Sequence, residues 1–189
     1  MIDLMKNLKT DVVESVQVES NSSGFEALFV EHWAHIYRLL YRLVGDPAEA
    51  EDLALETFFR LHKRYPLPEN DFNLGGWLQR VATNLGLHSI RGWNRRERYE
   101  MTAGKYALEQ VPQDDPAQVL AQEEERQLVR LALAQMNERQ SQILIMRHSG
   151  MSYRDIAQAL KLAPTSIGPL LLRAERELEK QYRAVAQEE

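Results

Sequence analysis

Apolar residues recur at steps of three and four along most of this chain, and nowhere do apolar and polar residues alternate for more than a few positions. The pattern is clearest over residues 25–44, where nine apolar side chains from Phe25 to Val44 keep this spacing. Such spacing places apolar residues on one face of a helix, which is then buried. We therefore predict an all-α fold.

Turn signals divide the first half of the chain into three helices. Gly45 is expected to end the first helix, and Asp46-Pro47 to cap and begin the second. In this second helix the spacing turns Leu53, Phe58 and Leu61 inward and leaves a charged stripe outside, comprising Glu49, Asp52, Glu56, Arg60 and Lys63. Pro66 and Pro68 end it, and a third helix is expected to resume at Gly76 or Trp77. The stripe fits a solvated face and a docking surface equally well.

Charge is segregated along the sequence. The whole chain carries a net charge of -5, yet residues 77–98 hold five arginines and one acid beside two tryptophans. Arginines pair with phosphates and flat rings stack on unpaired bases, so this stretch suits nucleic acid, although a solvated basic helix end has the same pattern. Residues 100–125 carry one lysine and seven acids. Pro112 and Pro116 argue against a continuous helix there, so we expect an acidic linker.

The last third predicts a helix-turn-helix. Ser152 is placed to cap a short helix, residues 160–162 form a tight turn, and a long helix follows to about Gln181. The alternative is an αα-hairpin without a role in DNA binding.

Several classes of protein are disfavoured. The chain has no cysteine and no run of eighteen apolar residues, and its first residues lack the apolar core of a signal peptide, so we expect a cytoplasmic protein without membrane insertion. It has no P-loop or nucleophile elbow, so we expect no enzyme. His32 and His35 lie one turn apart, but two histidines on a core-facing helix are more often packing or surface residues than metal ligands. We predict no metal and no cofactor.

Taken together, GDPAEAEDLALETFFRLHKRY, WLQRVATNLGLHSIR and MNERQSQILIMRHSGMSYRDIAQALKL resemble, in their order, a bacterial extracytoplasmic-function (ECF) sigma factor. The resemblance implies two small helical domains joined by a flexible acidic linker. Its divisions are an N-terminal extension (1–23), sigma region 2 (24–99), the linker (100–125), sigma region 4 (126–183) and a tail (184–189). The implied partners are core RNA polymerase, through its beta prime clamp helices and beta flap, promoter DNA, and an anti-sigma factor.

The resemblance also implies residue roles. Polymerase binding falls on Asp52, Leu53, Glu56, Thr57, Phe58 and Arg60. Opening and holding the minus 10 element falls on the loop residues Asn70, Asp71, Phe72 and Asn73, and on Trp77, Arg80, Asn84, Arg91, Arg95, Arg96 and Arg98. Minus 35 binding falls on Ser152, Tyr153, Arg154, Thr165, Ser166, Arg173 and Arg176. The linker would run toward the RNA exit path, its acids standing in for phosphate.

Two departures from the family pattern stand out. Lys161 replaces the usual turn glycine, so we expect a wider turn. Gly168-Pro169-Leu170 removes side chains that could bond base edges, and Pro169 predicts a helix start at Thr165 or Ser166. The weakened recognition helix leaves a second function open, a sigma-like interaction module that binds polymerase or an anti-sigma factor without opening promoters.

Overall fold

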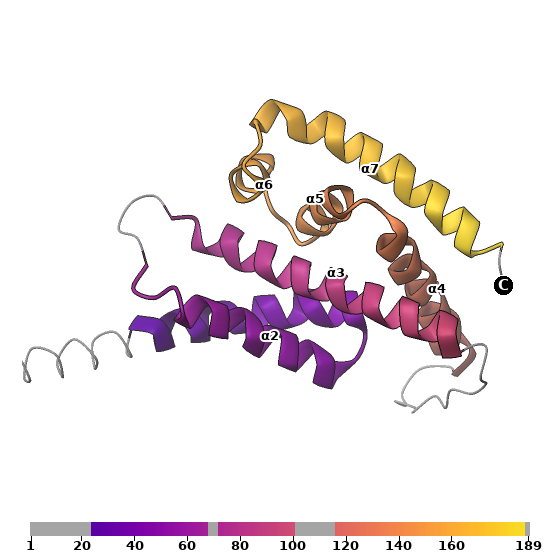
Figure 1. The fold of residues 1–189 in the computed structure, drawn as a ribbon, viewed down its shortest axis with the longest axis horizontal. Helices are drawn as coiled ribbons and strands as arrows, with labels where there is room; N and C mark the ends of the chain where they lie inside the picture. Colours follow the sequence, from indigo (N-terminus) through magenta and orange to yellow (C-terminus); the bar gives the residue numbers. More distant parts are fainter. Residues whose placement is uncertain (1–23, 68–71, 101–115, 188–189) are drawn as a thin grey trace, which may run out of the picture.

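The computed structural model describes residues 24–67, 72–100 and 116–187, and all regular structure in these ranges is helical. A first helix spans residues 24–44. It is followed by α2 (Pro47–His62), α3 (Leu74–Glu100), α4 (Pro116–Gln135), α5 (Glu138–His148), α6 (Tyr153–Leu160) and α7 (Pro164–Val185) (Figure 1). The prediction of an all-α fold is confirmed.

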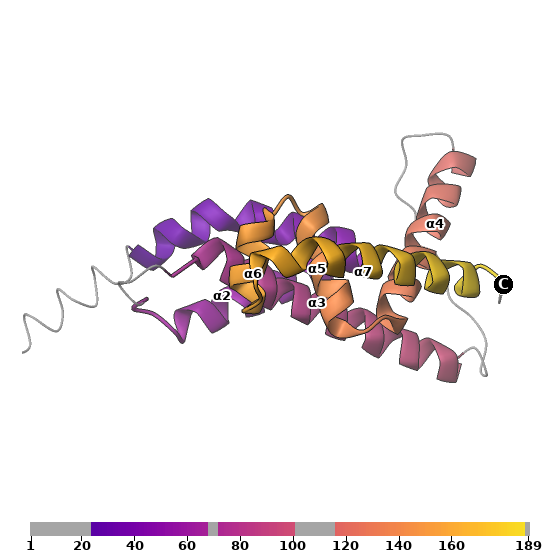
Figure 2. The same ribbon diagram turned by 90° about the horizontal axis from the view of Figure 1, so that it is seen from above.

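The third helix, α3, lies at the centre of the molecule. Figure 1 shows it between the 24–44 helix and α2 on one side and the C-terminal helices on the other. Helices α4, α5 and α6 each contact α3, and α7 packs across all three of them (Figure 2). The two halves therefore meet along α3, the helix that carries the basic stretch.

Gly45 and Asp46 form the connection between the first two helices as predicted. Gly45 takes a left-handed φ of 84°, and the Asp46 side chain accepts a 2.6 Å hydrogen bond from the backbone N–H of Glu49. Pro47 occupies the first turn of α2, where its missing N–H costs nothing. A side chain at position 45 would also meet the Arg130 guanidinium of α4, since an ideal Cβ would lie 2.4 Å from it. Backbone geometry and space thus both favour glycine at position 45.

Buried apolar side chains form one continuous cluster through both halves of the molecule. Phe58 and Leu78 fill the N-terminal half, and Ile143 and Ile156 the C-terminal half. Gly86 allows α3 to approach the first helix closely, because a Cβ there would lie 2.4 Å from Leu43 Cδ2. Close packing of this kind fixes the rotation of α3, and with it the directions in which its polar side chains point.

The starts of α3 and α4 differ from the predictions. Helix α3 begins at Leu74, ahead of Gly76, because the Asn73 side chain accepts a 2.7 Å bond from the backbone N–H of Gly76 and so caps the helix. Helix α4 begins at Pro116, inside the predicted linker. Proline breaks helix interiors but is favoured at the first position, so Pro116 marks a start rather than a barrier. Residues 101–115, most of the linker, and residues 1–23 lie outside the described residues.

Candidate polymerase and nucleic-acid interfaces

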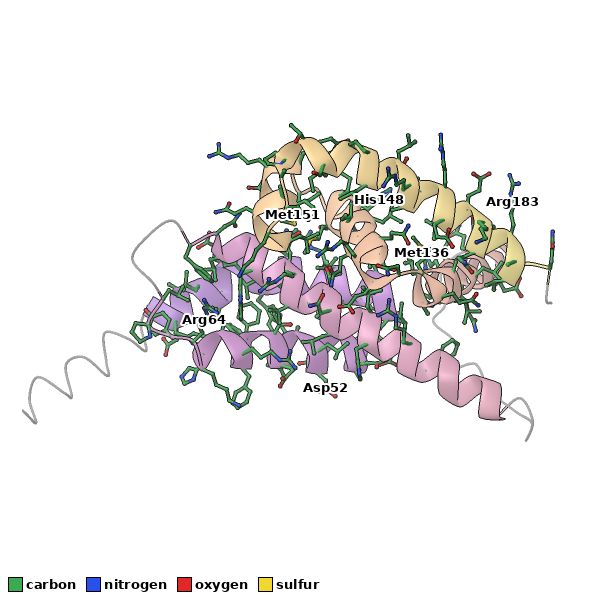
Figure 3. All side chains as sticks on the ribbon, turned by 45° about the horizontal axis from the view of Figure 1, so that its top comes forward. Asp52, Arg64, Met136, His148, Met151 and Arg183 are labelled. Atoms are coloured by element: carbon green, nitrogen blue, oxygen red, sulfur yellow. The ribbon has the colours of Figure 1, made fainter. Side chains whose placement is uncertain are left out.

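The outer face of α2 combines charges with exposed apolar side chains. Figure 3 places Asp52 on the side of α2 that faces away from the C-terminal helices. Glu56 and Arg60, one turn apart, form a 2.8 Å ion pair between half-exposed side chains. Leu55 and Phe59 share this region and are 47% and 53% exposed. The Lys63 ammonium lies 4.3 Å from the Phe59 ring centroid. An exposed apolar pair rimmed by charges is a surface suited to a protein partner.

Thr57 and Phe58, by contrast, are 0% and 2% exposed. The Thr57 hydroxyl donates to the Leu53 carbonyl at 2.8 Å, and the Phe58 ring packs 4.7 Å from that of Phe29. Leu53 itself is half-buried against the core. Thr57 and Phe58 therefore hold α2 in place and do not form its surface. Leu55 and Phe59 were missed, although helical spacing from the predicted stripe already places them beside it.

An aromatic cluster lies where the predicted minus 10 loop enters α3. The Phe72 and Trp77 ring centroids are 6.3 Å apart, and the Arg64 guanidinium lies 5.1 Å from the first and 5.9 Å from the second. Arg64, labelled in Figure 3, lies just beyond the C-terminal end of α2 and was not predicted, because only the fold brings its side chain to these rings. Asn70 and Asp71 lie outside the described residues.

Several polar side chains of α3 point toward the C-terminal half, whereas Ser89 bonds Glu49 of α2. Arg80 Nη1 donates to the Ala159 carbonyl at 3.2 Å. Arg91 donates through Nε and Nη2 to the carbonyls of Ala134 and Met136, at 3.2 and 3.1 Å. Figure 3 labels Met136 near the end of α4. Both arginines therefore bind carbonyls at helix C-termini, where the helix dipole is negative.

Amide side chains extend this row of contacts. Asn84 Oδ1 accepts from Gln142 Nε2 at 2.7 Å, and Gln79 Oε1 accepts from Ser149 Oγ at 2.8 Å. Asn73, besides capping α3, donates to Gln158 Oε1 at 3.1 Å. Beyond this row, Arg95, Arg96 and Arg98 belong to the last turns of α3, but their side chains lie outside the described part of the structure.

The geometry of α6 and α7 is that of a helix-turn-helix. Ser152 caps α6 by accepting from the backbone N–H of Asp155 at 3.1 Å. Lys161 adopts the left-handed conformation itself, with φ 55° and ψ 49°, and the Leu162 N–H bonds the Ala157 carbonyl at 2.8 Å. This is the pairing of a compact Schellman turn, so the expectation of a wider turn is wrong.

The long helix α7 begins one residue before the earlier of the two predicted starts. Pro164 occupies its first turn, and Pro169 consequently lies beyond the first turn, inside the helix. The prediction that Pro169 must fall within the first turn is therefore wrong. Missing its N–H, Pro169 leaves the Thr165 carbonyl without its usual helical partner, and Thr165 is solvent-exposed, so water can take that place.

The predicted minus 35 residues are mostly accessible. Ser152, Tyr153, Arg154, Thr165, Arg173 and Arg176 are exposed, and Ser166 is half-buried. The Arg147 guanidinium lies 5.4 Å from the Tyr153 ring centroid. Leu172, on the exposed side of α7 next to Arg173, is 50% exposed and was not predicted. The arginines are free to reach phosphates, and few base-reading side chains accompany them.

A groove of about 530 Å³ separates the first helix from α4 and α5. His35, Arg38 and Arg42 line one wall, and His148 (Figure 3) lines the other. Burial, together with the positive charges of Arg38, His32 and Arg42, lowers the pKa of His35 below its usual value. Its Nε2 lies 2.8 Å from Gln79 Nε2, which fits a neutral imidazole accepting from the amide.

The described ranges meet neither the requirements of a metal site nor those of a membrane-spanning helix. His32 and His35 are close in space, yet no group of three or more potential ligands forms among the described residues. None of the described helices is both long enough and apolar enough to span a bilayer.

Comparison with known proteins agrees with this geometry. The family model described as Sigma-70 region 2 matches residues 28–97, and the model described as Sigma-70, region 4 matches residues 126–185. The chain belongs to the ECF sigma factors. It is 34% identical over 110 residues to the ECF RNA polymerase sigma factor SigE of Mycolicibacterium smegmatis, an alignment spanning 57% of this chain but only 40% of that protein.

Other relatives are matched over nearly their whole length. The chain is 25% identical over 186 residues to the RNA polymerase sigma-H factor of Pseudomonas aeruginosa, covering 94% of this chain and 95% of that protein. The fold resembles the sigma factor RpoE of Bartonella quintana, solved in complex with the anti-sigma factor NepR. That match has a TM-score of 0.53 at 20% identity and covers 85% of this chain and 97% of the other. Both domains of the sigma factor are therefore present here, in the family's order.

Proposed function

We propose that this chain binds core RNA polymerase and directs it to promoters, where it opens the minus 10 element and contacts the minus 35 element. The observation that carries the proposal is the row of Arg80, Asn84 and Arg91 along α3, on the same chain as a helix-turn-helix with exposed arginines. Polymerase binding is assigned to the outer face of α2, through Asp52, Leu55, Glu56, Phe59 and Arg60.

Promoter opening in this scheme is driven by binding. Unpairing and flipping bases costs a few kcal/mol, which captured bases and phosphate contacts can offset. The cluster of Arg64, Phe72 and Trp77 supplies aromatic surface at the start of α3, and Asn84 supplies an amide about two turns further along the same helix. Arg80 and Arg91 supply positive charge for the backbone. This step needs no chemistry on the part of the chain.

Minus 35 contact in the proposal relies mainly on phosphates. Arg173 and Arg176 are exposed on α7, whereas Gly168, Pro169 and Leu170 offer no group that bonds a base edge. Changing Arg173 and Arg176 together to alanine is expected to weaken minus 35 binding across sequences and to lower its salt dependence. Unchanged binding by that double variant would show that the readout lies elsewhere.

We also propose a protein antagonist. The groove between the two halves presents Arg38, Arg42 and His148 over an apolar floor that includes Leu39 and Leu133. An acidic, amphipathic segment of an anti-sigma factor would match both features. In a pull-down with purified components, changing Arg38 and Arg42 to alanine is expected to weaken capture of the antagonist by this chain.

The alternative is a sigma-like interaction module. One observation favours it: α7 carries few side chains that could hydrogen-bond base edges. Transcription by core polymerase on genomic DNA, followed by sequencing of the transcripts, separates the two. The proposal predicts start sites that depend on this chain and share two upstream elements. An interaction module predicts the same transcripts with and without it.

A further inference from the structure

We infer that the groove between the first helix and the C-terminal helices binds a small amphipathic anion, an alkyl phosphate. Its headgroup would lie on Arg38 and Arg42, and its chain over the aliphatic floor of the groove. The inference goes beyond the proposed function, because it requires neither promoter DNA nor a protein antagonist. Its failure would leave the polymerase and promoter assignments standing.

The groove has the size and the lining of a small-molecule site. Its volume of about 530 Å³ falls within the range of about 300–1,000 Å³ that such sites occupy. Aliphatic side chains from three helices form its floor, namely Leu39, Leu43, Leu133 and Ile145. Among the described residues that line it, none is Phe, Tyr or Trp. A nucleobase would therefore find none of these rings to stack on, whereas an alkyl chain matches the floor.

The ionisable side chains that line the groove are all basic. Arg38 and Arg42 lie one turn apart on the first helix beside His35, and His148 of α5 lies across from them (Figure 3). Within the described residues, neither arginine nor His148 forms an ion pair with an acid. Arg38 Nε donates to the Ala34 carbonyl at 3.0 Å, which holds the side chain and leaves its two Nη groups for a ligand. Two uncompensated guanidinium groups match the double charge of a phosphate headgroup, which arginine binds through paired N–H bonds.

The local potential favours an anion at this place. Burial lowers the pKa of His35, and the positive charges of Arg38, His32 and Arg42 lower it further. A potential that disfavours a proton on the imidazole attracts a phosphate. A second groove of about 280 Å³ shares Arg42 but is also lined by the acid Glu125. The headgroup is therefore assigned to the side of Arg42 that faces Arg38.

A bound alkyl phosphate would affect protein binding. The antagonist segment proposed above uses the same arginines and the same apolar floor, so the ligand and the antagonist would exclude each other. A small molecule in this groove would thereby control whether the antagonist can bind.

Isothermal titration calorimetry of the full chain with n-octyl phosphate, kept below its micelle concentration, tests for the site. We expect one molecule bound per chain, at least ten-fold more tightly than inorganic phosphate, because the octyl chain adds apolar contact. ADP, which carries phosphates on a nucleoside, should bind more weakly than octyl phosphate. The inference would be overturned if octyl phosphate gave no binding or bound no better than inorganic phosphate. It would equally be overturned if ADP bound as tightly as octyl phosphate.

Charge variants test where the headgroup lies. The double variant Arg38→Gln and Arg42→Gln should weaken octyl phosphate binding at least ten-fold. Its matched control is Lys180→Gln with Arg183→Gln, which removes two positive charges from exposed ion pairs within α7 and should bind within two-fold of the unaltered chain. Far-UV circular dichroism establishes that both double variants keep their helices. An equal loss in the two would reveal an effect of net charge alone and sink the proposal.

Histidine NMR locates the ligand independently of these variants. Two of the five histidines of the chain, His35 and His148, line the groove. Their imidazole resonances should shift when octyl phosphate saturates the chain, whereas those of the exposed His62 and His88 should stay in place. Unshifted His35 and His148 resonances at a ligand concentration that calorimetry shows to be saturating would put the ligand elsewhere and refute the inference.

Discussion

Phe59 provides a quantitative test of the α2 surface. Its side chain is 53% exposed, which leaves roughly 100 Å² available out of the ~200 Å² that a phenyl side chain can bury. At about 25 cal/mol per Å², covering that area is worth roughly 2.5 kcal/mol, of which an alanine recovers a small part. Phe59→Ala is therefore expected to weaken binding to core polymerase by about 2 kcal/mol, or roughly 30-fold.

Titration of core RNA polymerase into fluorescently labelled protein, followed by anisotropy, measures this loss. Two controls define it. Val30→Ala alters another exposed apolar residue, 77% exposed on the first helix, and should leave the affinity unchanged. Phe58→Ala alters the buried neighbour and should lower the free energy of unfolding by about 3–5 kcal/mol. An affinity of Phe59→Ala within two-fold of the unaltered chain would refute the assignment of this face to polymerase.

Two further predictions concern stability. Lys161 is left-handed, and its side chain forms no ion pair among the described residues. Lys161→Gly removes the backbone strain, so the free energy of unfolding measured in urea should rise by about 0.5–1 kcal/mol. Lys161→Ala keeps the strain and should leave that free energy unchanged. The lowered pKa of His35 means that the unfolded chain takes up a proton at higher pH than the folded one, so stability should fall as pH drops below about 6.5. His35→Gln should flatten that dependence between pH 7.5 and 5.5, and an unchanged slope would contradict it.

Local sequence signals predicted much of the fold. Gly45, Asp46 and Ser152 act as predicted because turn and cap geometry depends on a few neighbouring residues. The start at Pro47 was predicted, but two other helix starts at prolines were not. Pro116 and Pro164 each open a helix, since the same ring that breaks a helix interior is favoured at its first position.

The candidate site was predictable in composition but not in its contacts. Spacing placed Arg80, Asn84 and Arg91 on α3, yet nothing local predicts their partners, which lie more than forty residues away. The arginines bind carbonyls at helix ends, and Asn84 binds a side chain of α5. Arg64 was missed for the same reason, because its partners Phe72 and Trp77 approach only in the folded chain. A local pattern shows which residue types a helix carries, whereas the contacts between helices that are distant in sequence depend on packing of the whole molecule.

Permanganate reactivity of promoter DNA reports whether this chain opens a promoter, since permanganate oxidises thymines that are unpaired and unstacked. The template is a fragment that carries a start site found by transcript sequencing. We expect reactive thymines upstream of that start site only when core polymerase and this chain are both present, and a loss of reactivity with Asn84→Ala. Full reactivity with core polymerase alone, or none with both proteins present, would contradict this expectation.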